Sequence, residues 1–271
     1  MRVKITYESL KGEILLPLHY NHLIQTLIYS SFSNKLATEL HNKGFEYGKR
    51  KFKLFTFSRI LEKGKKLYGK RLKEKALELG LRKVDEEMLL FKTISFFLSS
   101  PFESIIGDFG DKSLREREFN IIGQRIFVSN IEVLTQPRID DKVLVRMISP
   151  LTIHSTFVKE DMKKSYYYNP HEKEFSSLIE KNALKKFYLI YKRETDGLNL
   201  KIKPFLFSMK LNEKRVRFKQ TLIVGYTGIY EISGSRELIA VTYDTGLGDR
   251  NSEGFGMWEP WSPQERRKHG S

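Results

Sequence analysis

The chain has 271 residues, with 48 Lys and Arg against 33 Asp and Glu, a formal net charge of +15 and a pI near 9.7. Its length allows one large domain or two of ordinary size around a sizeable core. Cysteine is absent, which excludes a disulfide framework and a thiolate-ligated zinc site. The apolar runs are too short and interrupted to span a bilayer, and no signal-peptide pattern is visible, so we expect a soluble, cytoplasmic protein without a membrane partner.

The N-terminal half predicts the element order βαββαβ. Charged and apolar residues alternate at 2–7, which predicts a strand. Pro17 fits the first turn of a helix whose apolar stripe continues to Phe32. A short helix follows at 35–43, with Ser33 or Asn34 as its cap and Gly44 just past its end. The later elements are a half-buried strand at 51–60, a buried strand at 88–98, a helix that opens at 101–106 and a strand at 125–135.

A similar element order recurs in the C-terminal half. It consists of a strand at 141–149, a helix at 172–191, strands at 198–209 and 215–224, and a last strand at 237–245 that leads into a glycine-rich loop. This is the order of the ferredoxin-like unit, an antiparallel sheet with helices on one face. We therefore predict an α+β fold of two tandem ferredoxin-like (βαββαβ) domains, at 1–136 and 141–258, and a polar tail at 259–271.

Basic residues are concentrated between residues 43 and 83, where fifteen Lys or Arg accompany four acidic residues. Such a cluster in a protein of high pI is typical of polyanion binding, although an isolated charge run is more often a solvated face. Aromatic residues interleave with these charges and indicate a folded surface: Phe52, Phe55, Phe57 and Tyr68. We therefore expect a nucleic acid as the partner.

Four glycines surround a polar turn after the last predicted strand. Glycine is favoured where the backbone needs a positive φ or the close approach of another group, such as a phosphate in a nest of amide N–H groups. A dinucleotide fingerprint would need glycine where Asn251 stands, and a Walker A loop would need lysine where Phe255 follows. Phosphate binding and a structural hairpin or bulge are equally supported for Gly246, Gly248, Gly254 and Gly256.

Proton-transfer chemistry points to His41. Cysteine is absent and no spacing is typical of a metal site. His41 lies in the last turn of the predicted short helix, where the helix terminus favours a protonated imidazole, and by itself it is more often a helix-end charge. Tyr29 on the preceding helix and Lys49, Lys51 and Lys53 on the next strand favour catalysis. Structural or strand positions are expected for the histidines His19, His22 and His154.

Six stretches of the chain form a combined pattern. They are Leu27-Ile-Tyr29, the segment 35–41 that ends at His41, the segment 53–58 that begins with Lys53, Ser149-Pro-Leu, Glu172-Lys-Glu-Phe175 and the glycine loop. This combination, which extends from about residue 2 to residue 258, resembles the CRISPR-associated endoribonucleases of the Cas-six family. The glycine motif by itself is shared with the wider superfamily of repeat-associated RNA-binding proteins.

The resemblance implies two ferredoxin-like domains that bind CRISPR repeat RNA and cut the precursor transcript once per repeat, releasing guide RNAs. It further implies a reaction without a metal or cofactor, in which a 2′-hydroxyl attacks the adjacent phosphate and leaves a 2′,3′-cyclic phosphate and a 5′-hydroxyl. Tyr29, His41 and Lys53 match the family's tyrosine, histidine and lysine positions.

Chemical roles for these three residues follow from what the reaction requires. We expect His41 to act as the base, Tyr29 as the acid or an orienting group, and Lys53 as the stabiliser of negative charge, with Lys49, Arg50 or Lys51 as alternatives to Lys53. The glycine loop, with Arg250 and Asn251 at its tip, is expected to bind the RNA backbone, and the basic run 63–75 to contact flanking phosphates.

The competing interpretation is a non-catalytic repeat-RNA-binding subunit of a CRISPR effector complex. Such relatives share the fold and the glycine loop, but would lack the histidine, tyrosine and lysine set. The presence of Tyr29, His41 and Lys53 favours the enzyme. The sequence leaves open whether the protein dimerises and whether it joins an effector complex.

Overall fold

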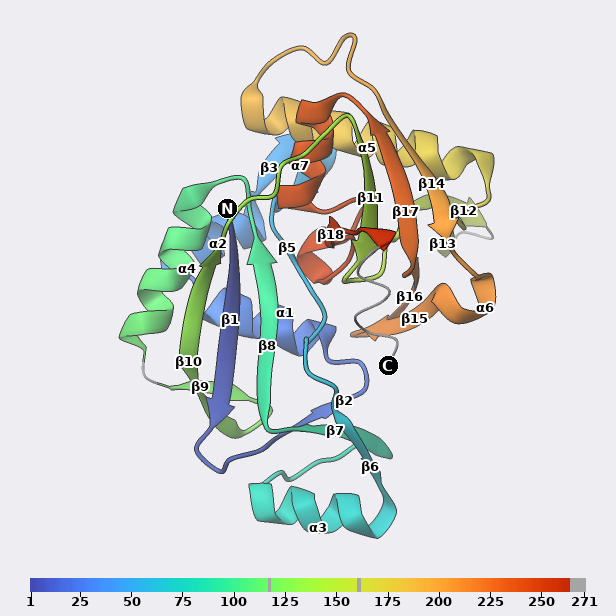
Figure 1. Cartoon of the computed structure of the whole chain (residues 1–271). Helices are drawn as coiled ribbons and strands as arrows, with labels where there is room; N and C mark the ends of the chain where they lie inside the picture. The colour runs from blue at the N-terminus through green and yellow to red at the C-terminus, as the bar shows by residue number, and fades with distance from the viewer. Residues whose placement is uncertain (117, 160–161, 264–271) are drawn as a thin grey trace. The chain divides into compact units, whose positions relative to one another are not determined.

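The protein forms two compact units (Figure 1). The structure is a computed structural model, and it describes residues 1–116, 118–159 and 162–263. The first unit comprises Met1–Lys43 and Ser58–Thr135, and the second comprises Gly44–Phe57 and Gln136–Ser271. Residues 44–57, which were predicted to lie in an N-terminal domain, group with the second unit.

The main sheet of the first unit is built around its first strand, which pairs on both sides with antiparallel neighbours. The order β8-β1-β10-β9 places β1, β8 and β10 as the first, third and fourth strands of a ferredoxin-like unit. Alternate residues of β1 are buried, as its sequence pattern predicted. The strands are β1 (Arg2–Ser9), β8 (Thr93–Ser99), β9 (Phe119–Ile121) and β10 (Gln124–Leu134).

Three helices accompany this sheet: α1 (Asn21–Ser30), α2 (Asn34–Asn42) and α4 (Glu103–Arg115). Helix α2 begins and ends close to its predicted bounds. The Ser33 side chain accepts a hydrogen bond from the amide of Leu36 at 3.3 Å, and Gly44 follows the helix with φ +61°. Pro17 does not open α1 as predicted, because it ends a strand and the helix begins four residues later.

A smaller sheet of order β2-β7-β6 packs with helix α3 in the same unit. Its elements are β2 (Ile14–Pro17), β6 (Lys65–Tyr68), α3 (Gly69–Leu79) and β7 (Glu87–Phe91). The single strand predicted at 88–98 is therefore wrong: β7 and β8 belong to different sheets. Much of the predicted basic run 63–75 lies on β6 and α3.

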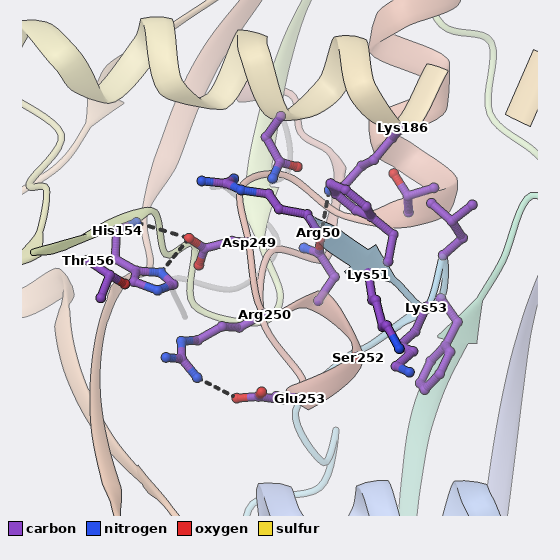
Figure 2. Close-up of a pocket in the computed structure, with 16 residues that line it drawn as sticks. Arg50, Lys51, Lys53, His154, Thr156, Lys186, Asp249, Arg250, Ser252 and Glu253 are labelled. Carbon is purple, nitrogen blue, oxygen red and sulfur yellow. Dashed lines mark hydrogen bonds and ion pairs between the residues drawn. The ribbon is translucent and has the colours of Figure 1, made fainter. Parts of the chain in front are cut away.

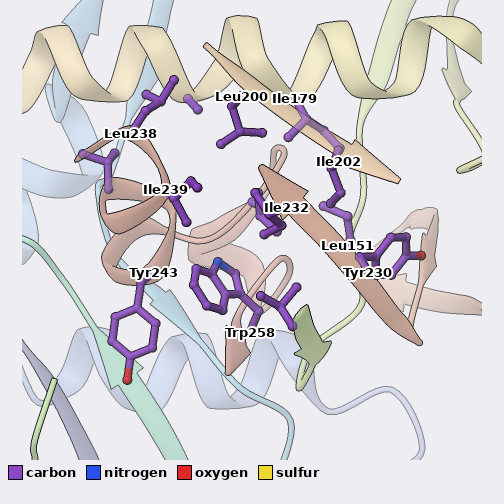
Figure 3. Close-up of a cluster of buried hydrophobic side chains, with 14 of the residues drawn as sticks. Leu151, Ile179, Leu200, Ile202, Tyr230, Ile232, Leu238, Ile239, Tyr243 and Trp258 are labelled. Atoms are coloured by element: carbon purple, nitrogen blue, oxygen red, sulfur yellow. The ribbon is translucent and has the colours of Figure 1, made fainter. Parts of the chain in front are cut away.

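The second unit has a four-stranded sheet of order β14-β17-β11-β18. Taken in chain order this is 2-3-1-4, the ferredoxin-like arrangement. Figure 3 shows how Ile179 of α5 and Leu238 of α7 lie with Ile202 and Ile232 of the sheet in one core. The elements are β11 (Lys142–Met147), α5 (Lys173–Tyr191), β14 (Leu200–Leu206), β17 (Ile229–Gly234), α7 (Arg236–Thr245) and β18 (Trp258–Pro260).

Hairpins and short elements are added to this second framework. One hairpin lies between β11 and α5, and another, preceded by the short helix α6, lies between β14 and β17. A third is formed by the early segment 44–57. The added elements are β3 (Phe45–Tyr47), β4 (Arg50–Phe52), β5 (Thr56–Phe57), β12 (His154–Lys159), β13 (Met162–Tyr167), α6 (Met209–Asn212), β15 (Glu213–Phe218) and β16 (Thr221–Tyr226).

Three predicted strands differ from the structure. The strand at 51–60 is divided into β4 and β5 by Leu54, whose φ of +52° no continuous strand tolerates. The strand at 215–224 is a hairpin that turns at Lys219, also at positive φ. The strand at 237–245 is helix α7, and the fourth strand is β18, which follows the glycine loop.

Helix α7 carries buried side chains on most of its circumference, so its sequence lacks the period of an exposed helix. No helix of the described ranges is long and apolar enough to cross a membrane. Of the tail predicted at 259–271, Glu259 and Pro260 belong to β18, and residues 264–271 lie outside the described residues.

Candidate functional site

Tyr29 and His41 are neighbours in the first unit. Tyr29 lies near the end of α1 and His41 in the last turn of α2. Their ring centroids are 6.4 Å apart and the rings meet edge to face at 83°. Phe32 also contacts the tyrosine, with ring centroids 5.8 Å apart, and so helps to fix its position. The structure thus brings together two of the three predicted catalytic side chains.

These two groups have different environments. Burial raises the pKa of the Tyr29 phenol to about 12, which keeps it protonated near neutral pH. His41 is exposed, and its Nδ1 lies 3.0 Å from Oδ1 of Asn42. The pair therefore offers a retained phenolic proton beside an imidazole that solvent and substrate can reach.

Lys53 belongs to the second unit, together with Lys49, Arg50 and Lys51. It is partly buried, and desolvation, with a smaller contribution from Lys51, lowers the pKa of its amine. Its Nζ lies 3.4 Å from the position that a Cβ on Gly44 would occupy. Gly44 belongs to the same unit as Lys53. Lys49, Arg50 and Lys51 are exposed on the β3–β4 hairpin.

The four glycines of the loop all have positive φ and are buried. A Cβ on Gly248 would lie 2.2 Å from the carbonyl oxygen of Thr152, and one on Gly256 would lie 2.0 Å from that of Leu247. At Gly246 the nearest group is the Asn251 amide nitrogen, at 2.5 Å. The groups that closely approach these three glycines are therefore atoms of the protein itself. This agrees with the structural interpretation of the loop, a hairpin or bulge. Gly254, at φ +86°, ends a short 3-10 turn, η1 (Asn251–Glu253).

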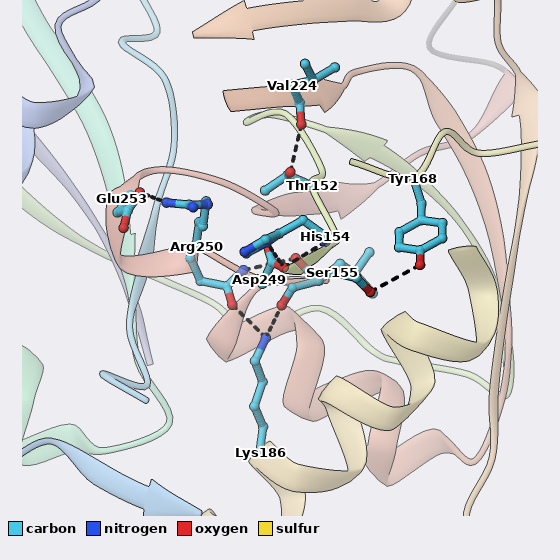
Figure 4. Close-up of polar contacts among 12 residues, drawn as sticks. Thr152, His154, Ser155, Tyr168, Lys186, Val224, Asp249, Arg250 and Glu253 are labelled. Carbon is cyan, nitrogen blue, oxygen red and sulfur yellow. Dashed lines mark hydrogen bonds and ion pairs between the residues drawn. The ribbon is translucent and has the colours of Figure 1, made fainter. Parts of the chain in front are cut away.

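A buried lysine forms hydrogen bonds with this loop (Figure 4). Lys186 of α5 is 2% exposed, and its Nζ donates hydrogen bonds to the carbonyl oxygens of Gly246 and Gly248 at 2.8 and 2.9 Å. It also donates to Oδ1 of Asn251 at 2.7 Å, while the Asn251 amide donates to the carbonyl oxygens of Leu247 and Phe255. The Asn251 side chain is thus engaged within the loop. No sequence signal singled out Lys186, which is one of several lysines in α5.

A pocket of about 550 Å³ lies beside the loop within the second unit (Figure 2). Its walls combine basic residues of the 50–53 segment with side chains of β12, α5 and the loop. His154, expected as a strand side chain, begins β12 but also lines this pocket. Arg250, predicted at the loop tip, lines it too and pairs with Glu253 at 3.1 Å. The residues drawn there include Arg50, Lys51, Lys53, His154, Lys186, Asp249 and Arg250.

The pocket histidine is held by a carboxylate. His154 Nδ1 lies 2.6 Å from Asp249 Oδ2, which also accepts a hydrogen bond from the His154 backbone amide at 3.0 Å. The Tyr167 ring packs against the imidazole, with ring centroids 5.4 Å apart. Across the described residues, no three His, Asp or Glu side chains converge as metal ligands. The Asp249 and His154 contacts join segments 95 residues apart, which no local sequence signal could have indicated.

Comparison with known proteins identifies similar chains. Residues 134–260 match the family model described as "CRISPR associated protein Cas6, C-terminal". The chain is 26% identical over 261 residues to CRISPR-associated endoribonuclease Cas6 1 of Methanocaldococcus jannaschii, an alignment covering 95% of this chain and 91% of that protein. It is 27% identical over 263 residues to CRISPR-associated endoribonuclease Cas6 of Pyrococcus furiosus, covering 94% and 87%.

A solved structure has the same fold. The product of a Cas6-related gene from Pyrococcus furiosus superposes with a TM-score of 0.76 and 21% sequence identity, covering 97% of this chain and 99% of that one. The predicted α+β class and the resemblance to the Cas-six family are confirmed.

Proposed function

Because the chain is similar to Cas6 proteins over nearly its whole length, we propose that it is an endoribonuclease that binds CRISPR repeat RNA and cuts the precursor transcript within each repeat. In the proposed reaction, a ribose 2′-hydroxyl attacks the adjacent phosphorus and the bond to the 5′-oxygen breaks. The products carry a 2′,3′-cyclic phosphate and a 5′-hydroxyl. No metal ion or cofactor takes part.

The contact between Tyr29 and His41 carries this proposal. Internal attack requires a base for the 2′-hydroxyl proton and an acid for the leaving 5′-oxygen. A phenol whose pKa is raised to about 12 is a poor base near neutral pH but retains a proton to donate, so Tyr29 takes the acid or orienting role. His41, exposed beside it, takes the role of base.

Lys53 is proposed to stabilise the negative charge that develops on the phosphate. A partly desolvated ammonium interacts more strongly with such charge than one in bulk water. Its partial burial, which Lys49, Arg50 and Lys51 do not share, supports its selection among the basic residues of this segment. Lys49, Arg50 and Lys51 lie on the adjoining hairpin and are the alternatives.

Binding of the RNA backbone is assigned to basic side chains outside this trio. Each phosphate contact adds affinity that falls with salt and carries no sequence information. The lysines and arginines of β6 and α3, the exposed hairpin residues and Arg250 are the proposed contacts. Gly246, Gly248 and Gly256 contribute by shaping the loop that presents Arg250, because each of them faces other protein atoms.

A single-turnover assay tests the reaction class. Excess protein is mixed with end-labelled repeat RNA in EDTA, beside the same RNA with one 2′-deoxy nucleotide at the cut. We expect only the all-ribose RNA to be cut, leaving a cyclic phosphate end. Cutting of both RNAs would exclude attack by the 2′-hydroxyl. Tight binding without cutting of either would assign the protein to the non-catalytic repeat-binding subunits instead.

A further inference from the structure

Three buried polar atoms, each on a residue that lines the pocket of the second unit, have no hydrogen-bond partner among the described residues. They are Oδ1 of Asn182, Oδ1 of Asp249 and Nε of Arg250. Asn182 is only 3% exposed, so its carbonyl is removed from bulk solvent. Buried polar groups are normally paired, because leaving them unpaired is costly. Their gathering in one pocket indicates a ligand with complementary groups.

Other contacts hold these three residues in place. For Asp249 and Arg250 the contacts are made by other atoms of the same side chain, and for Asn182 by a neighbouring residue of its helix. The other oxygen of Asp249 accepts two hydrogen bonds from His154, which fixes the carboxylate. Nη1 of Arg250 donates to Glu253 at 3.1 Å. Asn182 lies one helical turn before Lys186, which is anchored to the loop by three hydrogen bonds. The residues around the pocket therefore carry two acceptors and one donor whose hydrogen bonds are not made within the described protein.

The surroundings favour a nucleotide as the ligand. The volume of about 550 Å³ lies within the range of about 300–1,000 Å³ that is usual for small-molecule pockets. Arg50, Lys51 and Lys53 line the same pocket and suit a phosphate (Figure 2). The one carboxylate besides Asp249 among the described lining residues belongs to Glu253, which is paired with Arg250.

We propose that this pocket captures one unpaired guanine of the repeat RNA and reads its base edge. Guanine offers its amino group to Oδ1 of Asn182 and its imino N–H to Oδ1 of Asp249, and its O6 accepts from Nε of Arg250. Arg50 and Lys51 hold the attached phosphate. Unpaired RNA bases are commonly read in this way, splayed out and hydrogen-bonded on their edges. The inference rests on the proposed function only in taking RNA as the ligand.

Base replacement tests the pocket in the unmodified protein. Each guanine of the repeat RNA is replaced in turn by inosine, which lacks the amino group, and dissociation constants are measured by fluorescence anisotropy. We expect one unpaired position at which the replacement weakens binding about 10-fold, the equivalent of about 1.4 kcal/mol. Equal affinity for every inosine-containing RNA would overturn the proposal.

An asparagine substitution tests the residue. Asn182→Ala removes an acceptor that has no protein partner among the described residues, so the melting temperature should stay unchanged or rise. Affinity for the repeat RNA should fall about 10-fold, and the discrimination between guanine and inosine should disappear. The control is Asn21→Ala, at an equally buried asparagine of the first unit, which should leave that discrimination intact.

Two outcomes separate this inference from the proposed function. If Asn182→Ala folds and retains full discrimination, the pocket does not read the base, whatever the cleavage assay shows. If wild-type protein discriminates guanine but cuts no RNA, the pocket stands and the endoribonuclease proposal fails.

Discussion

The Tyr29–His41 pair and the glycine loop differ in burial and in the number of contacts they make within their units. His41 is exposed at the end of a short helix, and the contacts described for it are with a neighbouring ring and an adjacent side chain. The four glycines of the loop are buried, Gly248 and Gly256 abut backbone oxygens, and Lys186 binds the loop at three points. A substitution at the pair should therefore change function without changing stability, whereas a substitution in the loop should change both.

The largest expected effect is on cleavage by the His41→Ala variant. Loss of a general base typically costs about 10²–10⁴-fold in rate. We expect that loss in single-turnover cutting, with an unchanged melting temperature and an unchanged dissociation constant for repeat RNA. His19→Ala, at another exposed histidine of the first unit, is the control and should cut normally. Normal cutting by a folded His41→Ala protein would remove His41 from the mechanism.

The next effect is on stability at Gly248. A Cβ there would lie 2.2 Å from the Thr152 carbonyl oxygen at a φ of +66°, so Gly248→Ala should lose about 3 kcal/mol of unfolding free energy from clash and strain together. Gly12→Ala is the matched control. Gly12 has a φ of +77° but no atom within 4 Å of a Cβ, so only the conformational cost of about 1–2 kcal/mol applies.

Chemical denaturation of both glycine variants measures this difference. Equal losses would show that contact with Thr152 contributes nothing. A fully stable Gly248→Ala protein with weakened RNA binding would instead restore the interpretation that the glycine itself faces phosphate.

The smallest effect is expected at Lys186. Lys186→Met leaves three oxygens of the loop without their donor but also removes a buried charge, so we expect a net loss of about 2 kcal/mol near neutral pH. Lys181→Met, at an exposed lysine of the same helix, should have no such effect. Denaturant titrations of both variants provide the comparison.

The pH dependence at Lys186 has a definite sign. Burial lowers the pKa of its amine from 10.5 to about 7, against an opposing contribution from Asp249. Between these two values the unfolded chain holds a proton that the folded chain releases, so the stability contributed by Lys186 rises with pH from about 7 and levels off near 10.5. The stability of the wild type relative to Lys186→Met should therefore increase over this interval. A constant difference would show that the ammonium form persists in the folded protein.

Local signals predicted the pair better than the pocket. Helix α2 was predictable because Ser33 caps it and Gly44 follows it, and these two residues fix the turn that carries His41. Helix α7 was mistaken for a strand because its β-branched residues are buried on most sides. The hairpin turn at Lys219 has no glycine, asparagine or proline to mark it.

The pocket could not be predicted for a different reason. Asn182 and Asp249 come from a helix and a loop far apart in the sequence, and each looks ordinary in its own segment. Only tertiary packing brings their unpaired oxygens into one cavity. The glycine loop shows the converse. Its sequence pattern was evident, whereas the Thr152 carbonyl oxygen that Gly248 approaches belongs to a distant segment.

The composition of the second unit has a consequence for synthesis on the ribosome. The last strand of the first unit ends at Leu134, so its sheet can close while translation continues. The second unit combines residues 44–57, which emerge early, with Trp258, whose buried indole donates a hydrogen bond to the carbonyl oxygen of Thr242 on α7. The β3–β4 hairpin of this early segment must therefore wait through most of elongation before its own unit can form. Nascent chains stalled before residue 258 should be clients of chaperones that bind exposed aromatic residues.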